Sequence, residues 1–318
     1  MARVVVLLLP GVHLQDMAGP VQVLYEAAQL GGDYRLRFCS VERRVRTAQG
    51  LMLAELEPLP APRPGDLVLV PGTASAALDR LVVPRAWLRA AHQAGARVAS
   101  ICSGAFALGR AGLLDGRGCT THWKLLDRLQ RERPRARVLG SRLFVDDGGV
   151  ITSAGVASGI DMALALVELD HGPQLVARVA REMVVYLRRA GEHDQLSIYV
   201  DHRAHLHPGV HRVQDHLVAH PDGNPSLAEL GRIAGMSARN LARVFRRATA
   251  LTPKQFGAKV KLQVARDLAD DPERTVEAIA QSCGFADGRQ LRRLWRREFG
   301  APISSYRARR AAAERISS

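Results

Sequence analysis

One cysteine of the chain stands in a sequence setting that is typical of a reactive thiol. Ser100-Ile-Cys102-Ser103-Gly104 begins in the apolar run 98–101 and leads into a helix-forming stretch. A small residue, a cysteine and a glycine at a strand-to-helix turn have the form of a nucleophile elbow, in which a tight backbone turn presents the side chain. The amino end of the following helix is expected to lower the pKa of the Cys102 thiol. A buried structural cysteine fits the same residues, so the pattern leaves both interpretations open.

Further polar positions follow other predicted strands. Asp16 comes after the first apolar run of the chain, and Gly72 and Thr73 come after another, where their backbone N–H groups would form an anion pocket. Because α/β sheets bind ligands at the carboxyl ends of their parallel strands, we expect these positions to share one pocket with Cys102. His122 is expected near it, although a histidine with a structural hydrogen bond fits equally well. The predicted ligand-binding residues are Asp16, Gly72, Thr73, Cys102, Ser103 and His122.

A second group of residues with a chemical signature lies near the end of the chain. Two helical stretches each carry basic and amide side chains on the face opposite to their apolar residues. Arginine fits guanine edges and phosphates in a bidentate manner, and asparagine or glutamine fits adenine, so these faces predict DNA binding. The residues nearest each helix amino end should enter the major groove, and the later arginines should bind phosphate. The predicted DNA-binding residues are Arg239, Asn240, Arg243, Arg246, Arg247, Arg289, Gln290, Arg292, Arg293, Arg296 and Arg297.

The first of these stretches is the second half of a helix-turn-helix pattern. Ser226-Leu-Ala-Glu229 is a capping box that opens a helix, and Gly235 marks the turn that ends it. Ser237 then begins the arginine-bearing helix 238–247. Helix, short glycine-containing turn and helix together form a common DNA-binding unit.

The pattern recurs about 49 residues later. Thr275 caps helix 276–283, Gly284 marks the turn, and Asp287 caps the second arginine-bearing helix. Gly300 is suited to end that helix because glycine readily adopts the left-handed conformation of a helix end. The duplication makes a merely solubilising role for the arginines a poor explanation.

Charge supports this interpretation. The chain of 318 residues has a formal net charge of +14, and the segment from Ser226 to Ser318 carries 19 Lys and Arg against 9 Asp and Glu. A compact basic segment indicates a polyanionic partner, nucleic acid first and an acidic membrane surface second.

The apolar pattern predicts two domains. Apolar strands buried on both faces and separated by helices describe a doubly wound, mostly parallel α/β sheet with a flavodoxin-like sandwich architecture. The expected strands are 4–9, 36–39, 66–71, 97–101 and 150–152, and the expected helices are 19–30, 85–94, 104–111, 123–132, 158–170 and 173–189. From Ser226 onward only helical patterns remain. The predicted division is an α/β domain at 1–190, a linker at 191–210 and an all-α DNA-binding domain at 211–318.

Cysteine usage and hydropathy exclude several protein classes. The four cysteines are scattered without metal-ligand spacing, so we expect no disulfide framework, no metal site and a reducing, cytoplasmic location. The apolar run 4–9 is too short for a signal peptide, and no stretch approaches the length of a membrane span. No cofactor is expected.

The C-terminal third resembles the AraC/XylS DNA-binding domain. The resemblance covers 211–310 and rests on Gly284-Phe285, 291–300, Pro302 and Tyr306-Arg307. It implies two helix-turn-helix units joined by a long helix, here 253–268, that places both reading helices in successive major grooves of double-stranded DNA. Two residues depart from the pattern, Gly288 in place of serine and Trp295 in place of phenylalanine, and Gly288 is expected to soften the start of the second reading helix.

The segment 10–172 resembles the ThiJ/PfpI branch of the glutamine amidotransferase-like superfamily. The matching stretches are 14–20, 70–72, 101–104, 111–116, 120–123 and 152–155. In similar catalytic members such as isonitrile hydratases, the acid that matches Asp16 and the thiol that matches Cys102 carry the chemistry. Ser103 stands where those members have threonine, and the histidine that follows the cysteine in protease-like members is absent.

The combination of the two domains resembles the GlxA family of bacterial regulators. This resemblance implies a homodimeric transcription factor whose N-terminal domain senses a small molecule without turning it over. Two alternatives stay open: a hydratase or amidase that uses Cys102 with Asp16 and is recruited to DNA, and an oxidation sensor based on the Cys102 thiol. The sequence does not identify the effector or the operator.

Overall fold

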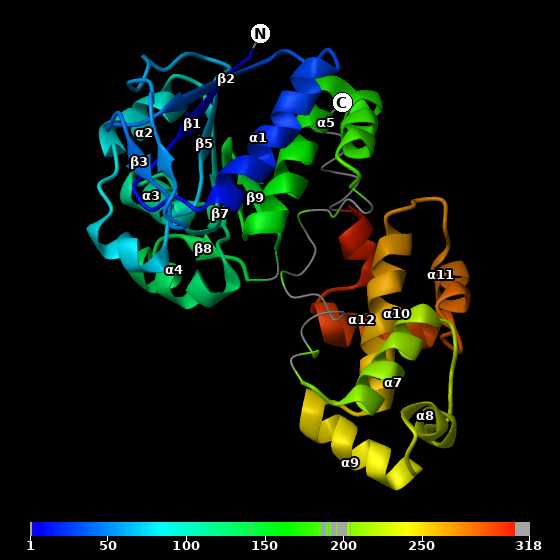
Figure 1. The fold of residues 1–318 in the computed structure, drawn as a ribbon. Coiled ribbons are helices and arrows are strands. Elements are labelled where there is room, and N and C mark those ends of the chain that lie inside the picture. The colour runs from blue at the N-terminus through cyan, green and yellow to red at the C-terminus, as the bar shows by residue number, and fades with distance from the viewer. Residues whose placement is uncertain are drawn as a thin grey trace. The chain divides into compact units, whose positions relative to one another are not determined.

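The computed structural model describes residues 2–140, 142–185, 189, 191, 195, 202–203 and 205–308. The chain divides into two compact units, Met1–Gln195 and Leu196–Ser318 (Figure 1). Much of the predicted linker at 191–210 lies outside the described residues, and the predicted domain limits remain a prediction.

The first unit is built on a six-stranded sheet. In spatial order its strands are β2 (Tyr34–Cys39), β1 (Ala2–Leu7), β5 (Leu67–Val70), β6 (Arg97–Ile101), β10 (Val150–Ser153) and β9 (Phe144–Asp147). All neighbouring pairs are parallel except β10 and β9. Short strands β3 (Val45–Arg46), β4 (Met52–Leu53), β7 (Gly118–Cys119) and β8 (Arg137–Val138) form two small additional sheets, which the apolar pattern did not predict.

Alternation along the strands buries both faces of the sheet. In β1, Val4 and Val6 belong to the core under α1 (Leu14–Gln29) and α5 (Val156–Glu182). Val5 and Leu7 belong to the opposite core, which is covered by α2 (Arg85–Gln93), α3 (Ala105–Arg110) and α4 (Leu126–Glu132). Helices on both faces of a mostly parallel sheet confirm the predicted doubly wound α/β architecture (Figure 1).

Three helix boundaries differ from the prediction. Helix α1 begins at Leu14, so Pro20 lies inside it, where it leaves the carbonyl of Asp16 without the usual helical donor. Element α5 begins at Val156, two residues earlier than predicted, and contains the predicted break between helices 158–170 and 173–189, because Gly172 takes a non-helical conformation (φ 81°, ψ 173°). It ends at Glu182, because Val184 takes a left-handed φ of 53° that stops the helix.

Short 3-10 turns also lie at positions where uninterrupted helix or loop was expected. They are η1 (Ser75–Arg80), η2 (Cys102–Gly104) and η3 (Trp123–Leu125). The predicted helices 104–111 and 123–132 therefore each begin with a tighter turn.

The second unit is helical throughout its described elements. These are α7 (Pro208–Ala219), α8 (Leu227–Ala234), α9 (Ala238–Thr249), α10 (Pro253–Ala269), α11 (Val276–Ser282) and α12 (Gly288–Phe299). One core joins α7, α8 and α9 to the first half of α10, and a second joins its last half to α11 and α12. The predicted pair of helix-turn-helix units connected by a long helix is confirmed. Among the described residues, no helix combines the length and apolarity that crossing a bilayer requires.

Candidate functional site

Cys102 occupies a strained turn at the carboxyl end of β6. Its backbone φ is 55°, which is unfavourable for a residue with a side chain, and the 3-10 turn η2 begins there. Two features of the surrounding structure allow this conformation. The Thr121 hydroxyl donates to the Cys102 carbonyl over 2.8 Å. At Gly104, a Cβ atom would lie 2.1 Å from the Val70 carbonyl oxygen, so the turn packs against β5 only with glycine there.

Gly72 marks the point where the predicted pocket residues converge. A Cβ atom at this position would lie 2.4 Å from Asp16 Oδ2, 2.9 Å from Ser103 Oγ and 3.0 Å from Cys102 Cβ. Ser103 Oγ donates to the Thr73 carbonyl (2.7 Å) and accepts from the Thr73 N–H (2.8 Å). The structure therefore brings together five of the six residues that the sequence assigned to ligand binding. It also uses the Thr73 N–H internally, so that group does not point into an anion pocket.

Asp16 is fully buried beside the Cys102 thiol. Neither of its carboxylate oxygens makes a hydrogen bond of standard geometry to the described residues. Burial raises the pKa of Asp16 to about 6, and the smaller effects of the His13 charge, the Cys102 thiol and the Gly72 amide act in the opposite direction. At neutral pH the carboxyl group is therefore close to its titration range.

The Cys102 thiol is held in its neutral form. Burial, followed by the negative charge of Asp16, raises the pKa of Cys102 to about 12. The predicted lowering of this pKa is therefore wrong. The residue is only 8% exposed, and the turn that follows it is a 3-10 turn leading to α3, a helix of six residues with little dipole to offer.

His122 contacts Gly155, which follows β10, rather than the Gly72 region. A Cβ atom at Gly155 would lie 3.2 Å from His122 Cδ2, and His122 Nδ1 accepts a 3.3 Å hydrogen bond from the Lys124 N–H. Partial burial and the charges of Lys124 and His13 lower the pKa of His122, so the ring is neutral at physiological pH. The ring makes no described hydrogen bond to Cys102, and its Nδ1 is occupied in capping η3.

Sequence reasoning missed two contributors to this region. His13 precedes α1, donates its N–H to the Gly72 carbonyl (2.8 Å), and acts electrostatically on both Asp16 and His122. Thr121 holds the Cys102 carbonyl. The sequence signals for them were weak: Thr121 lies in the family-matching stretch 120–123, and His13 lies three positions before Asp16.

Chemically, the site combines a neutral thiol, a carboxyl group near its pKa and buried oxygen atoms that make no hydrogen bond of standard geometry to the described residues. The Thr73 hydroxyl, like both Asp16 oxygens, is buried without a partner among the described residues. An unmade buried hydrogen bond costs about 1–3 kcal/mol, so a bound group that supplies the missing partners gains affinity. These properties suit binding better than nucleophilic attack by a thiolate.

The second candidate site is the pair of arginine-bearing helices, α9 and α12. Their starts are fixed by side-chain caps: Ser237 Oγ accepts from the Asn240 N–H (3.3 Å) and Asp287 Oδ1 from the Gln290 N–H (2.6 Å). The capping box of Ser226 that opens α8 is also present. Left-handed glycines end α8 and α12, as the sequence pattern predicted.

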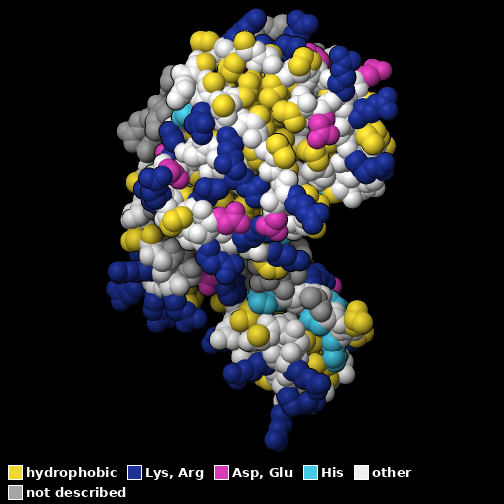
Figure 2. All heavy atoms as spheres, turned by 90° about the vertical axis from the view of Figure 1, so that its left-hand side faces the viewer, with side chains coloured by type: hydrophobic (Ala, Val, Ile, Leu, Met, Phe, Trp, Pro, Cys, Tyr) yellow, Lys and Arg dark blue, Asp and Glu magenta, His cyan; other side chains and the backbone are white. Residues whose placement is uncertain are grey.

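Apolar residues of each second helix are buried and the arginines are exposed. Leu241 and Phe245 of α9 correspond in the second unit to Leu291 and Trp295 of α12, and all four are buried. The exposed arginines are Arg239, Arg243, Arg246 and Arg247 on α9, and Arg289, Arg292, Arg293, Arg296 and Arg297 on α12. Figure 2 shows Lys and Arg side chains gathered at the lower end of the helical unit, where α9 lies in Figure 1.

Four predicted DNA-binding residues, Asn240, Arg243, Gln290 and Arg292, are engaged within the protein. Asn240 Oδ1 accepts from Arg243 (2.8 Å), and Gln290 Oε1 accepts from the Ala286 N–H (2.7 Å). Arg292 forms an ion pair with Glu277 of α11 (2.8 Å). The structure therefore leaves arginine rather than amide side chains free at the starts of both helices.

Gly288, which departs from the family pattern, lies at the first position of α12. A Cβ atom there would lie 2.7 Å from the Glu277 carboxylate and 3.3 Å from the Arg292 guanidinium. The glycine therefore makes room for the ion pair between α11 and α12 rather than only softening the helix start.

Comparison with known proteins assigns a family to each of the two units. Residues 2–169 match the DJ-1/PfpI family, and residues 230–309 match a helix-turn-helix domain family. The HTH-type transcriptional regulator GbdR of Pseudomonas aeruginosa is 31% identical over 93% of this chain and 81% of its own length. The HTH-type transcriptional regulator GlxA of Rhizobium meliloti is 28% identical over 70% and 68%.

A solved structure is similar to the first unit. The AraC family transcriptional regulator from Pseudomonas putida is 26% identical, with a TM-score of 0.50 over 57% of this chain and all of that chain. The family match spans more than half of the chain, and the similarity to GbdR extends through both units. The chain therefore belongs to the DJ-1/PfpI family and, with its helix-turn-helix domain, to the HTH-type transcriptional regulators that combine the two.

Proposed function

We propose that this transcriptional regulator reads specific sites on double-stranded DNA through α9 and α12, and that a small molecule bound at the Cys102 turn alters this binding. The observation that carries the proposal is the duplicated helix-turn-helix with exposed arginines on both second helices. The regulatory role is inferred from the family of transcriptional regulators to which the chain belongs.

The geometry of the helical unit supports simultaneous use of both helices. Helix α10 contributes to the cores of both helix-turn-helix units, so the two reading helices belong to one packed body. Its 17 residues span about 25 Å, which separates the two units on a scale comparable to the roughly 34 Å repeat of the major groove. Arg239 and Arg243 on α9, with Arg289 and Arg293 on α12, are the arginines best placed to reach bases or adjacent phosphates.

The DNA-binding step is tested with charge-matched variants. Arg239→Ala with Arg243→Ala, and separately Arg289→Ala with Arg293→Ala, should each weaken specific binding by at least tenfold, since one base contact contributes about 1–3 kcal/mol. The control, Arg131→Ala with Arg178→Ala, removes the same charge from exposed positions of the α/β unit and should leave affinity unchanged. Equal affinity in all three double variants would refute the assignment.

For the effector, the buried polar atoms around Cys102 supply the argument. Asp16 and Thr73 together present three buried oxygen atoms without described partners, beside a thiol that is slightly exposed. A ligand that donates hydrogen bonds there would be favoured. Comparing DNA-site selection by Cys102→Ala with that by Cys119→Ala, which alters another buried cysteine of the same unit, tests whether the signal enters at this turn.

An enzymatic function is a second candidate because Asp16, with its pKa near 6, is positioned to accept the Cys102 proton. Turnover of an isonitrile or an amide that disappears in Cys102→Ala but persists in Cys119→Ala would establish it. An oxidation sensor would instead lose DNA binding on peroxide treatment, and Cys102→Ser would abolish that loss. Both alternatives need a thiolate, which the surroundings of Cys102 disfavour, so we rank them below effector binding.

We further propose that the regulator acts as a homodimer in the bacterial cytoplasm, where its DNA target lies. A dimer would double the contacted DNA and explain how a ligand in the α/β unit changes affinity, by changing the spacing of two reading units. Sedimentation of the full chain, with and without a cognate site, tests the oligomeric state.

A further inference from the structure

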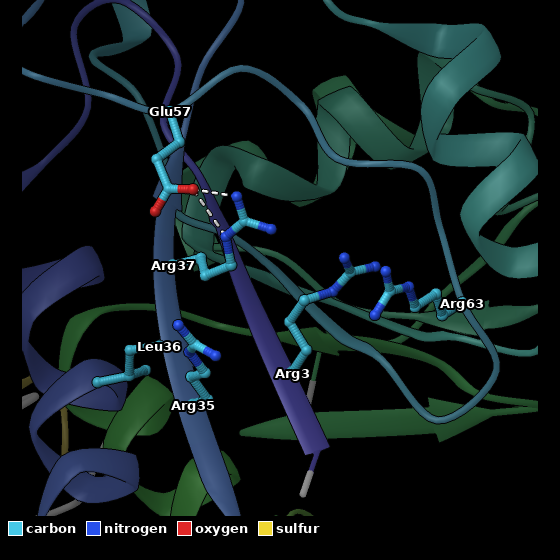
Figure 3. A pocket seen from close by; sticks show the side chains of 6 residues that line it. All are labelled: Arg3, Arg35, Leu36, Arg37, Glu57 and Arg63. Atoms are coloured by element: carbon cyan, nitrogen blue, oxygen red, sulfur yellow. Dashed lines mark hydrogen bonds and ion pairs between the residues drawn. The ribbon is translucent and has the colours of Figure 1, made fainter.

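The α/β unit has a polar pocket that lies apart from the Cys102 turn. The pocket lies beside the edge strand β2 and has a volume of about 470 Å³ (Figure 3). Its lining residues are Arg3, Arg35, Leu36, Arg37, Glu57 and Arg63. We call it the β2-edge pocket.

The β2-edge pocket and the Cys102 turn lie toward opposite ends of the parallel strands. Arg3 lies near the start of β1, and Asp66, which pairs with it, immediately precedes β5. Gly72 and Cys102, in contrast, follow the ends of β5 and β6. Because these strands are parallel, the β2-edge pocket lies toward their amino ends and the Cys102 turn lies at their carboxyl ends.

The pocket holds an excess of positive charge. Arg37 is paired with Glu57 through a 2.8 Å hydrogen bond from Nε, and Arg3 Nε donates to Asp66 over 3.0 Å. Arg35 and Arg63 form no ion pair with any described residue. Four guanidinium groups therefore share two carboxylates, which leaves two positive charges uncompensated.

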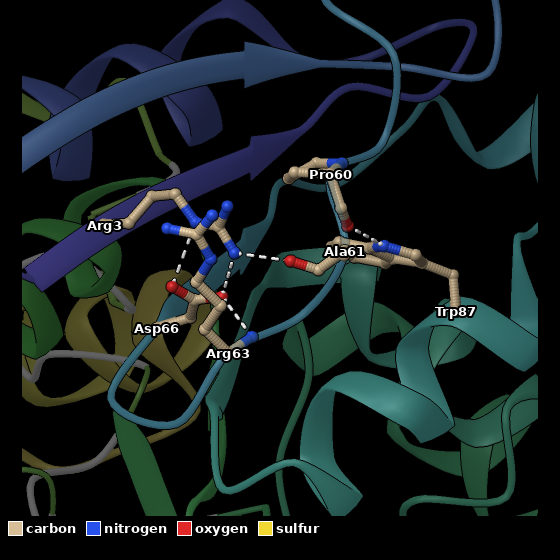
Figure 4. A network of polar contacts seen from close by, with 6 residues as sticks. All are labelled: Arg3, Pro60, Ala61, Arg63, Asp66 and Trp87. Carbon is tan, nitrogen blue, oxygen red and sulfur yellow. Dashed lines mark hydrogen bonds and ion pairs between the residues drawn. The ribbon is translucent and has the colours of Figure 1, made fainter.

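The arginines are held in place by a proline-rich segment. The Arg63 N–H donates to Asp66 Oδ2 (2.8 Å), Arg3 Nη2 donates to the Ala61 carbonyl (2.7 Å), and Trp87 Nε1 donates to the Pro60 carbonyl (2.7 Å) (Figure 4). Both close views place the guanidinium groups of Arg3 and Arg63 next to one another. Adjacent like charges repel, and an anion between them removes that repulsion.

Protection of the sheet edge does not account for this arrangement. Basic residues on edge strands prevent unwanted strand pairing, and Arg35 and Arg37 fit that role. However, Arg3 lies on the interior strand β1 and Arg63 comes from a loop. The edge of β2 is also already partly covered, because the Glu57 N–H donates to the Phe38 carbonyl (2.9 Å).

We propose that the β2-edge pocket binds a small organic anion with at least two negative charges, such as a phosphate ester or a diphosphate. Guanidinium groups bind phosphate oxygens in a bidentate manner, and the volume falls within the range of small-molecule sites. The site would give the regulator a second input that is independent of the Cys102 turn.

The test uses the full chain and sodium pyrophosphate at constant ionic strength. Hydrogen exchange followed by mass spectrometry should show protection of residues 57–66 on addition of pyrophosphate, and calorimetry should give its dissociation constant. Hydrogen exchange is needed in addition to calorimetry because it identifies which residues the anion protects. The arginines of α9 and α12 also attract anions and would contribute to the calorimetric signal. Arg35→Gln with Arg63→Gln should abolish the protection at 57–66 and weaken this binding at least tenfold.

Matched variants make the outcomes decisive. Arg131→Gln with Arg178→Gln removes two exposed charges from the same unit and should keep the protection, and Arg35→Lys with Arg63→Lys should retain part of it. Unchanged exchange at 57–66 in the wild type, or equal protection in the Arg35→Gln and Arg63→Gln variant, would overturn the proposal. A third outcome would also overturn the proposal: a DNA fragment protects residues 57–66, and the Arg35→Gln and Arg63→Gln variant binds DNA more weakly. The pocket would then be part of the DNA-binding surface.

Discussion

Replacing Asp16 by asparagine should change how the stability of the α/β unit depends on pH. The pKa of this buried carboxyl is about 6 in the folded chain, against an ordinary value of 3.8. Folding therefore favours the protonated form, and the charged form is destabilised by about 3 kcal/mol at pH values above both pKa values. Asparagine has nearly the same shape and no charge, so it does not carry this cost.

The sign follows from proton binding. Between pH 3.8 and 6 the folded chain holds a proton on Asp16 that the unfolded chain has lost, so this group lowers stability as the pH rises. Relative to Asp16→Asn, the wild type should lose about 2 kcal/mol of unfolding free energy between pH 4.5 and 7. The change with pH is diagnostic, because unsatisfied amide N–H groups of the asparagine add an offset that does not titrate.

Urea denaturation monitored by tryptophan fluorescence measures this difference, since Trp87 and Trp123 both belong to the α/β unit. The control is Asp33→Asn, which removes the charge of an exposed acid of the same unit. A pH-independent gap between the wild type and Asp16→Asn would show that Asp16 is not destabilised by burial. A gap of the opposite slope would indicate an undetected cationic partner.

Three further predictions concern single positions. In urea denaturation, Gly284→Ala should destabilise the helical unit by well over the roughly 1 kcal/mol that we expect for Gly300→Ala. Both glycines have a positive φ, but only at Gly284 would the new Cβ atom lie 1.8 Å from a backbone oxygen. Equal losses of stability in the two variants would contradict this reasoning. Asp287→Ala removes the side-chain cap of α12, so it should cost about 1 kcal/mol of stability and weaken DNA binding, whereas Asp287→Asn should retain both. An alanine variant that is indistinguishable from the wild type would show that the cap is dispensable. Iodoacetamide should modify Cys102 very slowly at pH 7 in the native chain, because its thiol has a pKa of about 12; rapid alkylation mapped to Cys102 by mass spectrometry would contradict a neutral thiol.

The fold was largely predictable because its signals are local. The apolar runs of the parallel strands and the caps at Ser226, Ser237 and Asp287 depend on short stretches of sequence. The caps lie where the pattern placed them, and the strands lie within two residues of their predicted bounds. The start of α1 was misplaced because proline usually begins a helix, whereas Pro20 is tolerated inside one. Strand β9 and the four two-residue strands escaped prediction because their pairing is set by distant partners.

The proximity of five of the predicted pocket residues could be predicted from the sequence, but their electrostatics could not. Topology alone brings Asp16, Gly72 and Cys102 to one edge of the sheet. The pKa of Cys102, however, depends on how completely the thiol is buried and on the carboxylate placed beside it, and both are properties of tertiary packing. The β2-edge pocket escaped for the same reason, since Arg3, Arg35 and Arg63 are far apart in sequence.

The central claim is that α9 and α12 read DNA sequence, and selection of bound fragments from a genomic DNA library at near-physiological salt tests it most directly. The account predicts that the wild type recovers a few discrete sites, and that these sites are lost in the variant carrying Arg239→Ala, Arg243→Ala, Arg289→Ala and Arg293→Ala. It also predicts a steep fall of affinity with rising salt, because phosphate contacts release counterions. Recovery of fragments without sequence preference, or the same sites in the variant, would contradict the account.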